Sequence, residues 1–196
     1  MNLRYEKVTG ASIKDIVNQL AKVRIEVFGA YPYLYEGSLE YEQAYLKTYW
    51  QSEGAMVFCV YDENVLVGAS TCIPLKDETD EVKAPFEAAG LDIETIYYFG
   101  ESVLLEKYRG EGIGNRFFEA REEHAKLSGE FKFAYFCAVQ RPSDHPLKPE
   151  GYKPLDVFWL KKGYQMSTLE SKFSWKDINE PKETMKSMLY WFKELG

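Results

Sequence analysis

The stretch EKYRGEGIGNRFFEAREEHA, residues 106–125, places three glycines at alternate positions directly before a helical pattern. Gly110, Gly112 and Gly114 follow Arg109, although glycine is a poor helix former. The first N–H groups of a helix have no partner within the helix, and the helix dipole favours a negative charge beside them. Glycines let phosphate oxygens approach these groups closely. The stretch therefore indicates a phosphate-binding turn more than a glycine-rich turn without a ligand.

Two familiar phosphate-binding motifs do not fit this stretch. A dinucleotide-binding turn requires GxGxxG and an acidic residue at the end of the next strand. Here the spacing is GxGxG, and the next predicted strand, residues 131–139, is followed by QRP without an acid. A P-loop requires Lys and then Ser or Thr after its last glycine. Asn115 and Arg116 stand there instead, so the ligand belongs to another class of phosphate or pyrophosphate compound.

The rest of the chain fits one mixed α/β domain over residues 1–196, without repeats or a linker. Alternating and continuous apolar runs predict strands at 3–9, 56–61, 65–73, 96–105, 131–139, 164–167, 171–175 and 187–195. Helical periodicity predicts helices at 12–28, from 38 onward, at 113–127 and at 155–162, and the acidic segment 77–92 is expected to hold a helical turn.

Two details refine the predicted helices. Ser12 and Asp15 have the spacing of a capping box at the start of the first helix. In the helix after the glycines, an apolar stripe is expected to face the core and to end at Leu127, with Gly129 at the C-terminal cap.

Composition limits the classes of function. The chain has 196 residues with 45% hydrophobic and 28% charged residues, as expected for a soluble globular domain. Its formal net charge of −7 argues against a nucleic-acid binder and suits a cationic substrate. No apolar run predicts a signal peptide or a membrane span. Cys59, Cys72 and Cys137 lack metal-ligand spacing, so we expect no metal and reduced, buried thiols in a cytoplasmic protein.

The segment Arg109 to Gly114 resembles the R/Q-x-x-G-x-G/A signature of the GCN5-related N-acetyltransferases (GNAT), with a matching residue type at every required position. FWLKKGY, residues 158–164, is similar to the late F-Y-x-x-x-G-F element of the family, and the order of predicted elements agrees across nearly the whole chain. The resemblance implies an α/β (α+β) fold: a central mixed, mostly antiparallel sheet, splayed between its middle strands and flanked by helices.

The resemblance also implies an activity, the transfer of an acetyl group from acetyl-CoA to a primary amine by direct attack. The signature loop would bind the pyrophosphate of acetyl-CoA, and the preceding strand would offer backbone groups to its pantetheine arm. Expected partners are acetyl-CoA and an amine acceptor, without nucleic acid or a membrane, and a homodimer is one expected assembly. The implied cofactor-binding residues are Val103, Leu104, Arg109, Gly110, Gly112, Ile113, Gly114 and Asn115.

On the acceptor side, Glu101 is the one charged residue inside YYFGESVLL, where many relatives carry an acidic residue facing the amine. It would bind the ammonium or take its proton through water; the alternative is a surface residue on a half-exposed strand. Tyr31, Tyr33 and Tyr35 lie in the loop that forms one wall of the acceptor site in relatives, or they only pack that loop. The acidic chain favours a small cationic amine, with a protein or peptide amine as the alternative.

Two positions depart from the family pattern. Trp159 stands four residues before Gly163, where many members have a tyrosine that acts as general acid, and Lys153 stands where an asparagine often meets the cofactor. Tyr152, Cys137 or water could substitute for the missing acid, or the CoA thiolate leaves without help. The missing tyrosine also keeps open a catalytically idle acyl-CoA-binding or sensing domain.

Overall fold

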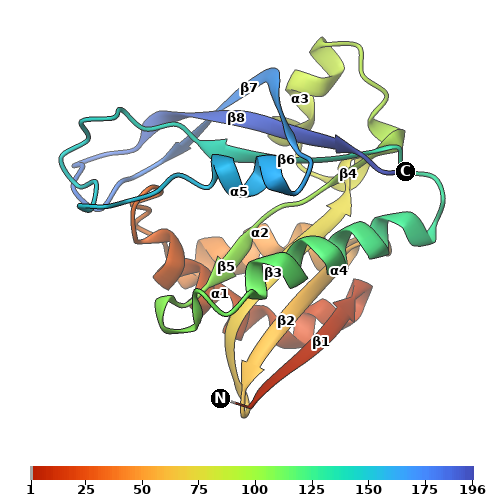
Figure 1. Ribbon diagram of the computed structural model, residues 1–196, viewed down its shortest axis with the longest axis horizontal. Coiled ribbons are helices and arrows are strands. Elements are labelled where there is room, and N and C mark those ends of the chain that lie inside the picture. Colours follow the sequence, from red (N-terminus) through yellow and green to blue (C-terminus); the bar gives the residue numbers. More distant parts are fainter. Residues whose placement is uncertain (1) are drawn as a thin grey trace.

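The computed structural model describes residues 2–196, and a mixed eight-stranded sheet forms its centre (Figure 1). The strand order is β1-β2-β3-β4-β6-β8-β7, with β5 pairing with β3. Within the described residues, β4 and β6 form the one parallel pair, so the sheet is mostly antiparallel as predicted. The strands are β1 Leu3–Thr9, β2 Met56–Asp62, β3 Val65–Pro74, β4 Ile96–Tyr98, β5 Ser102–Leu104, β6 Phe133–Val139, β7 Gln165–Trp175 and β8 Thr184–Glu194.

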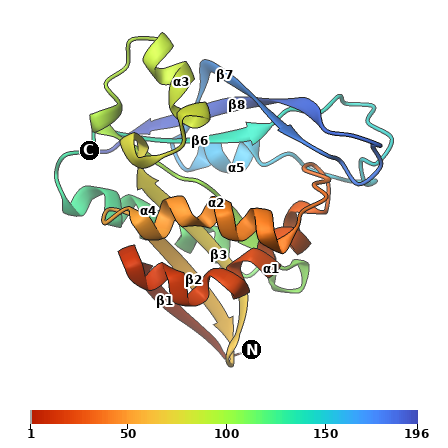
Figure 2. The same ribbon diagram turned by 180° about the vertical axis from the view of Figure 1, so that it is seen from behind.

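Helices cover both faces of this sheet. The helices α1 and α2 lie on one face (Figure 2), and α4 and α5 lie on the other (Figure 1). Two clusters of buried apolar side chains fill the spaces between the layers. The helices are α1 Val17–Phe28, α2 Leu39–Gln51, α3 Asp80–Ala88, α4 Ile113–Leu127 and α5 Asp156–Lys161, with short 3-10 segments at η1 Gly10–Ile16, η2 Leu75–Asp77, η3 Ile93–Thr95 and η4 Glu106–Tyr108.

Most predicted elements are confirmed, with corrections at their ends. The capping box at Ser12 is wrong, because residues 10–16 form the 3-10 segment η1 and no side chain caps η1 or α1. The acidic connection holds a nine-residue helix, α3, rather than a single turn. The two late strands 164–167 and 171–175 form the one strand β7, with a register shift between Met166 and Glu170.

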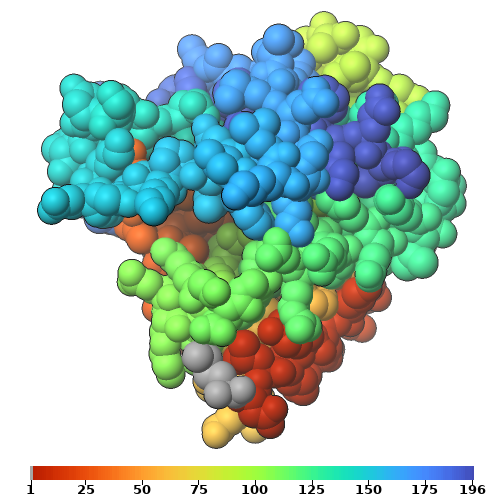
Figure 3. Space-filling model, viewed as in Figure 1, coloured from red at the N-terminus to blue at the C-terminus, as the bar shows by residue number. Residues whose placement is uncertain are grey.

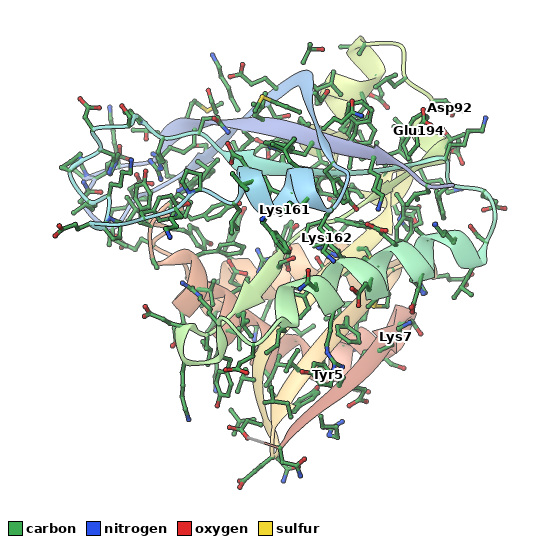
Figure 4. The ribbon with its side chains drawn as sticks, viewed as in Figure 1. Tyr5, Lys7, Asp92, Lys161, Lys162 and Glu194 are labelled. Atoms are coloured by element: carbon green, nitrogen blue, oxygen red, sulfur yellow. The ribbon has the colours of Figure 1, made fainter. Side chains whose placement is uncertain are left out.

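The helix after the glycines, α4, packs across β2 and β3 and reaches the edge strand β1. Leu127 does not join its buried face, since this side chain is 79% exposed, whereas Phe118 and Ala125 are buried. From β1, Lys7 forms an ion pair of 3.1 Å with Glu123 of α4, beside Tyr5 (Figure 4). Arg116, near the start of α4, lies 4.5 Å from the Tyr5 ring, so β1 contacts α4 at two points along its length.

The sheet opens between β5 and β6. The ladder between β4 and β6 ends where Tyr98 pairs with Tyr135 and the N–H of Phe99 donates to Tyr135 O at 2.7 Å. Beyond that point β5 pairs with β3, while β6 continues with β8. This opening is the splay that the sequence predicted, and it leaves one edge of β5 without a partner strand.

Candidate active site

An extra residue in the strand that runs from β4 to β5 marks the start of the opening. Two residues lie between Ser70 and Ile73 on β3, but three lie between their partners, Tyr98 and Ser102. A strand with one residue more than its partner contains a β-bulge, which bends the strand and redirects its side chains. The bulge therefore lies at residues 99–101.

Hydrogen bonds place this bulge at Gly100 and Glu101, which both oppose Thr71. Gly100 N–H donates to Thr71 O at 3.1 Å, and Thr71 N–H donates to Glu101 O at 3.0 Å. A Cβ atom at Gly100 would overlap Tyr49 Oη of α2, so only glycine fits there. The bulge brings residue 100 against α2 and turns the Glu101 carboxylate toward α1.

The Glu101 carboxylate meets a buried arginine and a second carboxylate. Its Oε1 lies 2.5 Å from Nη1 of Arg24, an ion-pair contact whose angles do not satisfy hydrogen-bond geometry. The Nε of Arg24 donates to Glu42 on α2, and all three side chains are buried. Burial alone would lower the pKa of the guanidinium, but Glu101 and Glu42 hold that pKa well above its ordinary value. One cation is thus shared by two carboxylates.

This charge cluster forms part of the wall of a cavity of about 250 Å³ on the α1–α2 face. Tyr33 and Tyr35 also line it, so the structure brings Glu101 together with two of the three predicted tyrosines. Tyr31 does not line the cavity; its ring packs against Tyr152 at 4.7 Å and His145 at 5.7 Å. The remaining wall consists of Arg24, Phe28, Tyr41, Glu42, Tyr45, Thr79, Glu81, Val82, Tyr98, Gly100, Cys137, Phe173, Ser174, Trp175 and Met188.

The tyrosine loop is held in place by Arg141, which follows β6. The Arg141 guanidinium donates to Pro32 O at 2.7 Å and to Tyr33 O at 2.6 Å. It also forms a bidentate pair with Asp177, with N–O distances of 2.7 and 2.9 Å. Planar bidentate pairs are geometrically specific. Arg141 therefore reinforces the contact between the loop after α1 and the segment after β7, which also pair directly at Tyr35 and Asp177.

On the other face, the signature glycines shape the entry into α4. Gly110 and Gly112 have φ angles of +86° and +77°, which L side chains rarely adopt. No side chain caps α4, and its first turn holds no acidic residue. The N–H groups of Ile113 and Gly114 donate to no oxygen of residues 2–196, whereas Asn115 N–H donates to Gly112 O at 3.0 Å. The start of α4 thus presents free donors and the positive end of the helix dipole.

The unpaired edge of β5 provides further backbone groups. Leu105 N–H donates to Val67 O at 3.0 Å, and hydrogen-bonded residues alternate along an antiparallel ladder. The backbone of Val103 therefore faces β3, and that of Leu104 faces the opening, where Arg109 Nε donates to Leu104 O at 3.3 Å. The Val103 side chain is fully buried. Of the two residues predicted to offer backbone groups, the geometry favours Leu104, together with Ser102.

The start of α4 and the open edge of β5 border a hollow on the molecular surface. Figure 3 shows this hollow between the green glycine segment and the blue segment that contains α5. Lys161 and Lys162 lie at the end of α5 that faces α4 (Figure 4), and Lys162 Nζ is 3.5 Å from Glu119 of α4. A Cβ atom at Gly114 would meet only Phe158 of α5, at an ordinary distance of 3.5 Å. Basic groups and free N–H donors thus flank one recess.

No family model and no curated protein matches the sequence. Solved structures do match. A GNAT-family acetyltransferase from Streptococcus pneumoniae shares 12% identity at a TM-score of 0.59, with both chains covered completely. The chain has the GNAT fold. A ribosomal-protein-alanine N-acetyltransferase from Brucella melitensis shares 15% identity over 100% of both chains, with a TM-score of 0.61. A protein from Salmonella typhimurium, solved with acetyl-CoA as its cofactor, shares 7% identity over 99% of this chain and 94% of its own, with a TM-score of 0.59.

Within this GNAT fold, Trp159 packs among aromatic rings instead of offering a proton. Its ring lies 5.0 Å from Phe136 and 5.1 Å from Trp191. Cys137 is a better donor candidate, because it lines the cavity and burial raises the pKa of its thiol to about 12. Burial also raises the pKa of Tyr152. Both groups therefore stay protonated at neutral pH.

A second buried arginine, Arg121 of α4, reaches the bulge from the opposite face. It is 2% exposed, and its Nη1 donates to Glu101 O at 3.2 Å. Its guanidinium lies 4.5 Å from the Phe99 ring and 4.8 Å from the Phe118 ring. Among residues 2–196 no carboxylate lies within ion-pair distance of Arg121, and burial lowers the pKa of its guanidinium. The backbone of Glu101 is thus fixed independently of its side chain.

The sequence interpretation missed Arg24 and Glu42, although a signal was present. Arg24 lies four residues after Leu20, on the apolar face of α1, and Glu42 lies four residues before Leu46, on the buried face of α2. Charges of opposite sign at core positions of consecutive helices indicate a buried pair, because an unpaired buried charge is very costly.

A larger cavity of about 830 Å³ adjoins this site, and Thr79 lies in the wall of both cavities. It is bordered by residues 128, 130 and 131, beyond the C-terminal end of α4, whereas the glycines precede its N-terminus. Its inner carboxylates already have partners: Ser52 Oγ donates to Asp77 and Tyr49 Oη donates to Glu78, at 2.5 and 2.9 Å. We therefore assign the candidate site to the smaller cavity and to the start of α4.

Among residues 2–196, no group of three or more His, Cys, Asp and Glu side chains is arranged to hold a metal ion. No helix in the same range has the length and the apolar composition that crossing a membrane requires.

Proposed function

We propose that the protein is an N-acetyltransferase that moves the acetyl group of acetyl-CoA to a primary amine of a small molecule. One observation carries the proposal: the opening between β5 and β6 joins two different sites on opposite faces of the sheet. Free N–H donors at the start of α4 lie on one face, and the acid-lined aromatic cavity lies on the other. Acetyl-CoA on one face and the acceptor amine on the other could therefore meet at this opening.

The residues beside α4 fit the chemical groups of acetyl-CoA. The free N–H groups of Ile113 and Gly114, with no acidic residue in the first turn, suit a pyrophosphate. Arg109 would add a positive charge, and the backbone of Leu104 would pair with the pantetheine amides. When bound, acetyl-CoA supplies an activated thioester, and these residues fix its position relative to the opening.

The residues of the cavity would handle the amine. The Glu101 carboxylate would bind the ammonium or accept a proton through water before the neutral amine attacks. The Cys137 thiol, which stays protonated at neutral pH, would donate to the leaving thiolate, unless the thiolate leaves without help. Direct attack needs no covalent enzyme intermediate, and no side chain is required as a nucleophile.

A second candidate is a catalytically idle acyl-CoA-binding domain, because Trp159 packs where many relatives have a tyrosine. The Brucella neighbour is named as acting on the alanine of a ribosomal protein, so a peptide amine is the alternative acceptor. The cavity volume of about 250 Å³ favours a small molecule over a peptide chain.

Calorimetry with acetyl-CoA and steady-state CoA release with a panel of amines test the proposal. Gly114→Asp places a negative charge at the start of α4, and Gly114→Asn is its neutral control of equal size. We expect the Asp variant to bind acetyl-CoA roughly tenfold more weakly than the Asn variant, because the charge opposes the phosphates. Equal affinities would refute the phosphate assignment. Tight binding without release for any amine would favour the idle domain.

A further inference from the structure

The acceptor cavity has one cationic side chain in its wall within the described residues, and that cation is already engaged. Arg24 is 7% exposed; its Nε donates to Glu42 and its Nη1 lies 2.5 Å from Glu101. Its guanidinium carbon lies 4.6 Å from the Tyr45 ring and 5.1 Å from the Phe28 ring. Carboxylates and aromatic rings therefore surround Arg24 on its edges and faces.

The cations just outside the cavity wall are engaged as well. Arg141 forms its bidentate pair with Asp177, at 2.7 and 2.9 Å. Lys186 lies 3.4 Å from Asp177 and 2.8 Å from Glu180. Its side chain and that of Arg141 are each less than a tenth exposed. A negatively charged group that entered the cavity would thus find no free cation of residues 2–196 in or next to the cavity wall.

The wall instead carries surplus negative charge. The wall contains three carboxylates, those of Glu42, Glu81 and Glu101, but only one cation among the described residues, Arg24. Glu42 is fully buried, and its Oε1 accepts no hydrogen bond from residues 2–196. A ring of aromatic side chains, which attract cations through their faces, completes the wall. These rings belong to Phe28, Tyr33, Tyr35, Tyr41, Tyr45, Tyr98, Phe173 and Trp175.

On this basis, and resting on the proposed acetyl transfer, we propose that the acceptor is a hydrophobic primary monoamine without a carboxylate. The matching α-amino acid is rejected, because its carboxylate would lie unpaired beside Glu42 and Glu101, and an unpaired buried charge is costly. The aromatic wall holds the apolar body of the amine, and the surplus charge attracts its ammonium.

The reaction balances as follows. The ammonium first releases one proton to water, and the neutral nitrogen then attacks the thioester carbonyl. The new C–N bond forms while the C–S bond breaks. The amide nitrogen loses its second proton, and the CoA thiolate takes up one proton. The net result is one amide, one CoA thiol and one released proton for each ammonium and acetyl-CoA consumed.

Matched pairs of acceptors test the inference: phenethylamine against phenylalanine, and tyramine against tyrosine, each with acetyl-CoA. We expect kcat/KM for the amine to exceed that for the amino acid by about a hundredfold, since polar groups left unpaired in a site discriminate strongly. Calorimetry of the same pairs in the presence of CoA gives a second readout. Equal use of both members, or binding of neither, would overturn the inference.

A gain-of-charge variant distinguishes charge from shape. Tyr41 is an exposed residue of α2 at the cavity wall. Tyr41→Arg supplies a cation there, and Tyr41→Gln is its neutral control. We expect the Arg variant to lower the ratio of kcat/KM for the amine to kcat/KM for the amino acid by roughly tenfold. The Gln variant should keep the wild-type ratio. Unchanged ratios in both would overturn the charge argument.

Failure of the inference can be told apart from failure of the proposed function. If the chain acetylates amino acids as well as amines, acetyl transfer stands and the rejection of carboxylates is wrong. If acetyl-CoA does not bind in calorimetry, the proposed function itself fails.

Discussion

Two buried arginines contact the same residue, Glu101, from opposite faces of the sheet, but the partners of their guanidinium groups differ. Arg24 contacts the Glu101 carboxylate from α1, and Arg121 donates to the Glu101 carbonyl oxygen from α4. Burial lowers the pKa of both guanidinium groups, but two carboxylates reverse the effect for Arg24. Arg121 has aromatic rings and carbonyl oxygens as its partners.

The difference extends to the side chains around each arginine. On the α4 face, burial lowers the pKa of His124 and raises that of the Cys72 thiol to about 12, so neutral forms are favoured. On the α1–α2 face, Glu42 and Glu101 keep a full cation buried. The ion pairs of Arg24 are therefore buried on the cavity face, whereas ion pairs of α4, such as Lys7 with Glu123, are exposed.

Replacing Arg24 should have the largest effect. Arg24→Met leaves Glu42 and Glu101 buried without a cation, and we expect the free energy of unfolding to fall by about 3–5 kcal/mol. Urea denaturation measures it. The matched control is the triple variant Arg24→Met/Glu42→Leu/Glu101→Leu, which removes all three charges and should recover much of the loss. A loss below about 1 kcal/mol in the single variant, the value of an exposed pair, would contradict the buried cluster.

Replacing the Glu101 carboxylate should affect the acceptor rather than the fold. Glu101→Gln keeps the shape and leaves Arg24 paired with Glu42, so the stability loss should be moderate. We expect kcat/KM for the amine to fall on the order of a hundredfold, with unchanged acetyl-CoA affinity, because a general base is lost. An ammonium-binding role would instead show as a defect that shrinks at high pH, where the amine is already neutral. Wild-type kinetics at every pH would reduce Glu101 to a structural partner of Arg24.

Replacing Arg121 should cost much less than replacing Arg24, despite similar burial. Arg121→Met removes a desolvated cation that has no carboxylate partner and fills the space between Phe99 and Phe118 with an apolar chain of similar length. Two hydrogen bonds to carbonyl oxygens are lost, so we expect a change within about 1–2 kcal/mol in urea denaturation. A loss as large as that of Arg24→Met would show that the α4 face also depends on a buried charge.

The smallest expected effect concerns pH and His124. Burial depresses its folded-state pKa below the ordinary value of 6.5. As pH falls from 6.5 toward that lower pKa, the unfolded chain binds the proton first, so stability is retained above this window and declines within it. His124→Gln has no imidazole to protonate. Between pH 7 and pH 5, the unfolding free energy of the wild type should therefore fall more than that of the variant. A difference that stays constant across this range would contradict a buried neutral histidine.

Much of the fold could be predicted because local patterns determine it. The apolar run of β6 and the glycines before α4 indicate a strand and a helix start by themselves. The helix α2 begins at Leu39, close to the predicted start near Ser38. The pairing of Arg24 with Glu101 could not be predicted, because residues 77 positions apart meet only after α1 packs on the sheet.

Local patterns also gave misleading results where tertiary contacts decide. The family resemblance implied one wall formed by the tyrosine loop, or else a loop that these rings only pack; Tyr33 and Tyr35 line the cavity, whereas the Tyr31 ring packs against Tyr152. Leu127 has the right helical spacing for the core, but it is the last residue of α4 and lies beyond the sheet. A periodic pattern contains no information about where the neighbouring layer ends.

The extra residue at Gly100 and Glu101 determines in which direction each later residue of the strand points its side chain and its backbone groups. Side chains and backbone groups alternate with a period of two, so a strand has an even and an odd frame. Deleting one residue here would switch the frame: the Val103 side chain would leave the core, and the backbone groups of Leu104 would turn from the opening to β3. A single insertion or deletion at the bulge would therefore reverse which residues of β5 direct their backbone groups toward β3 and which direct them toward the opening.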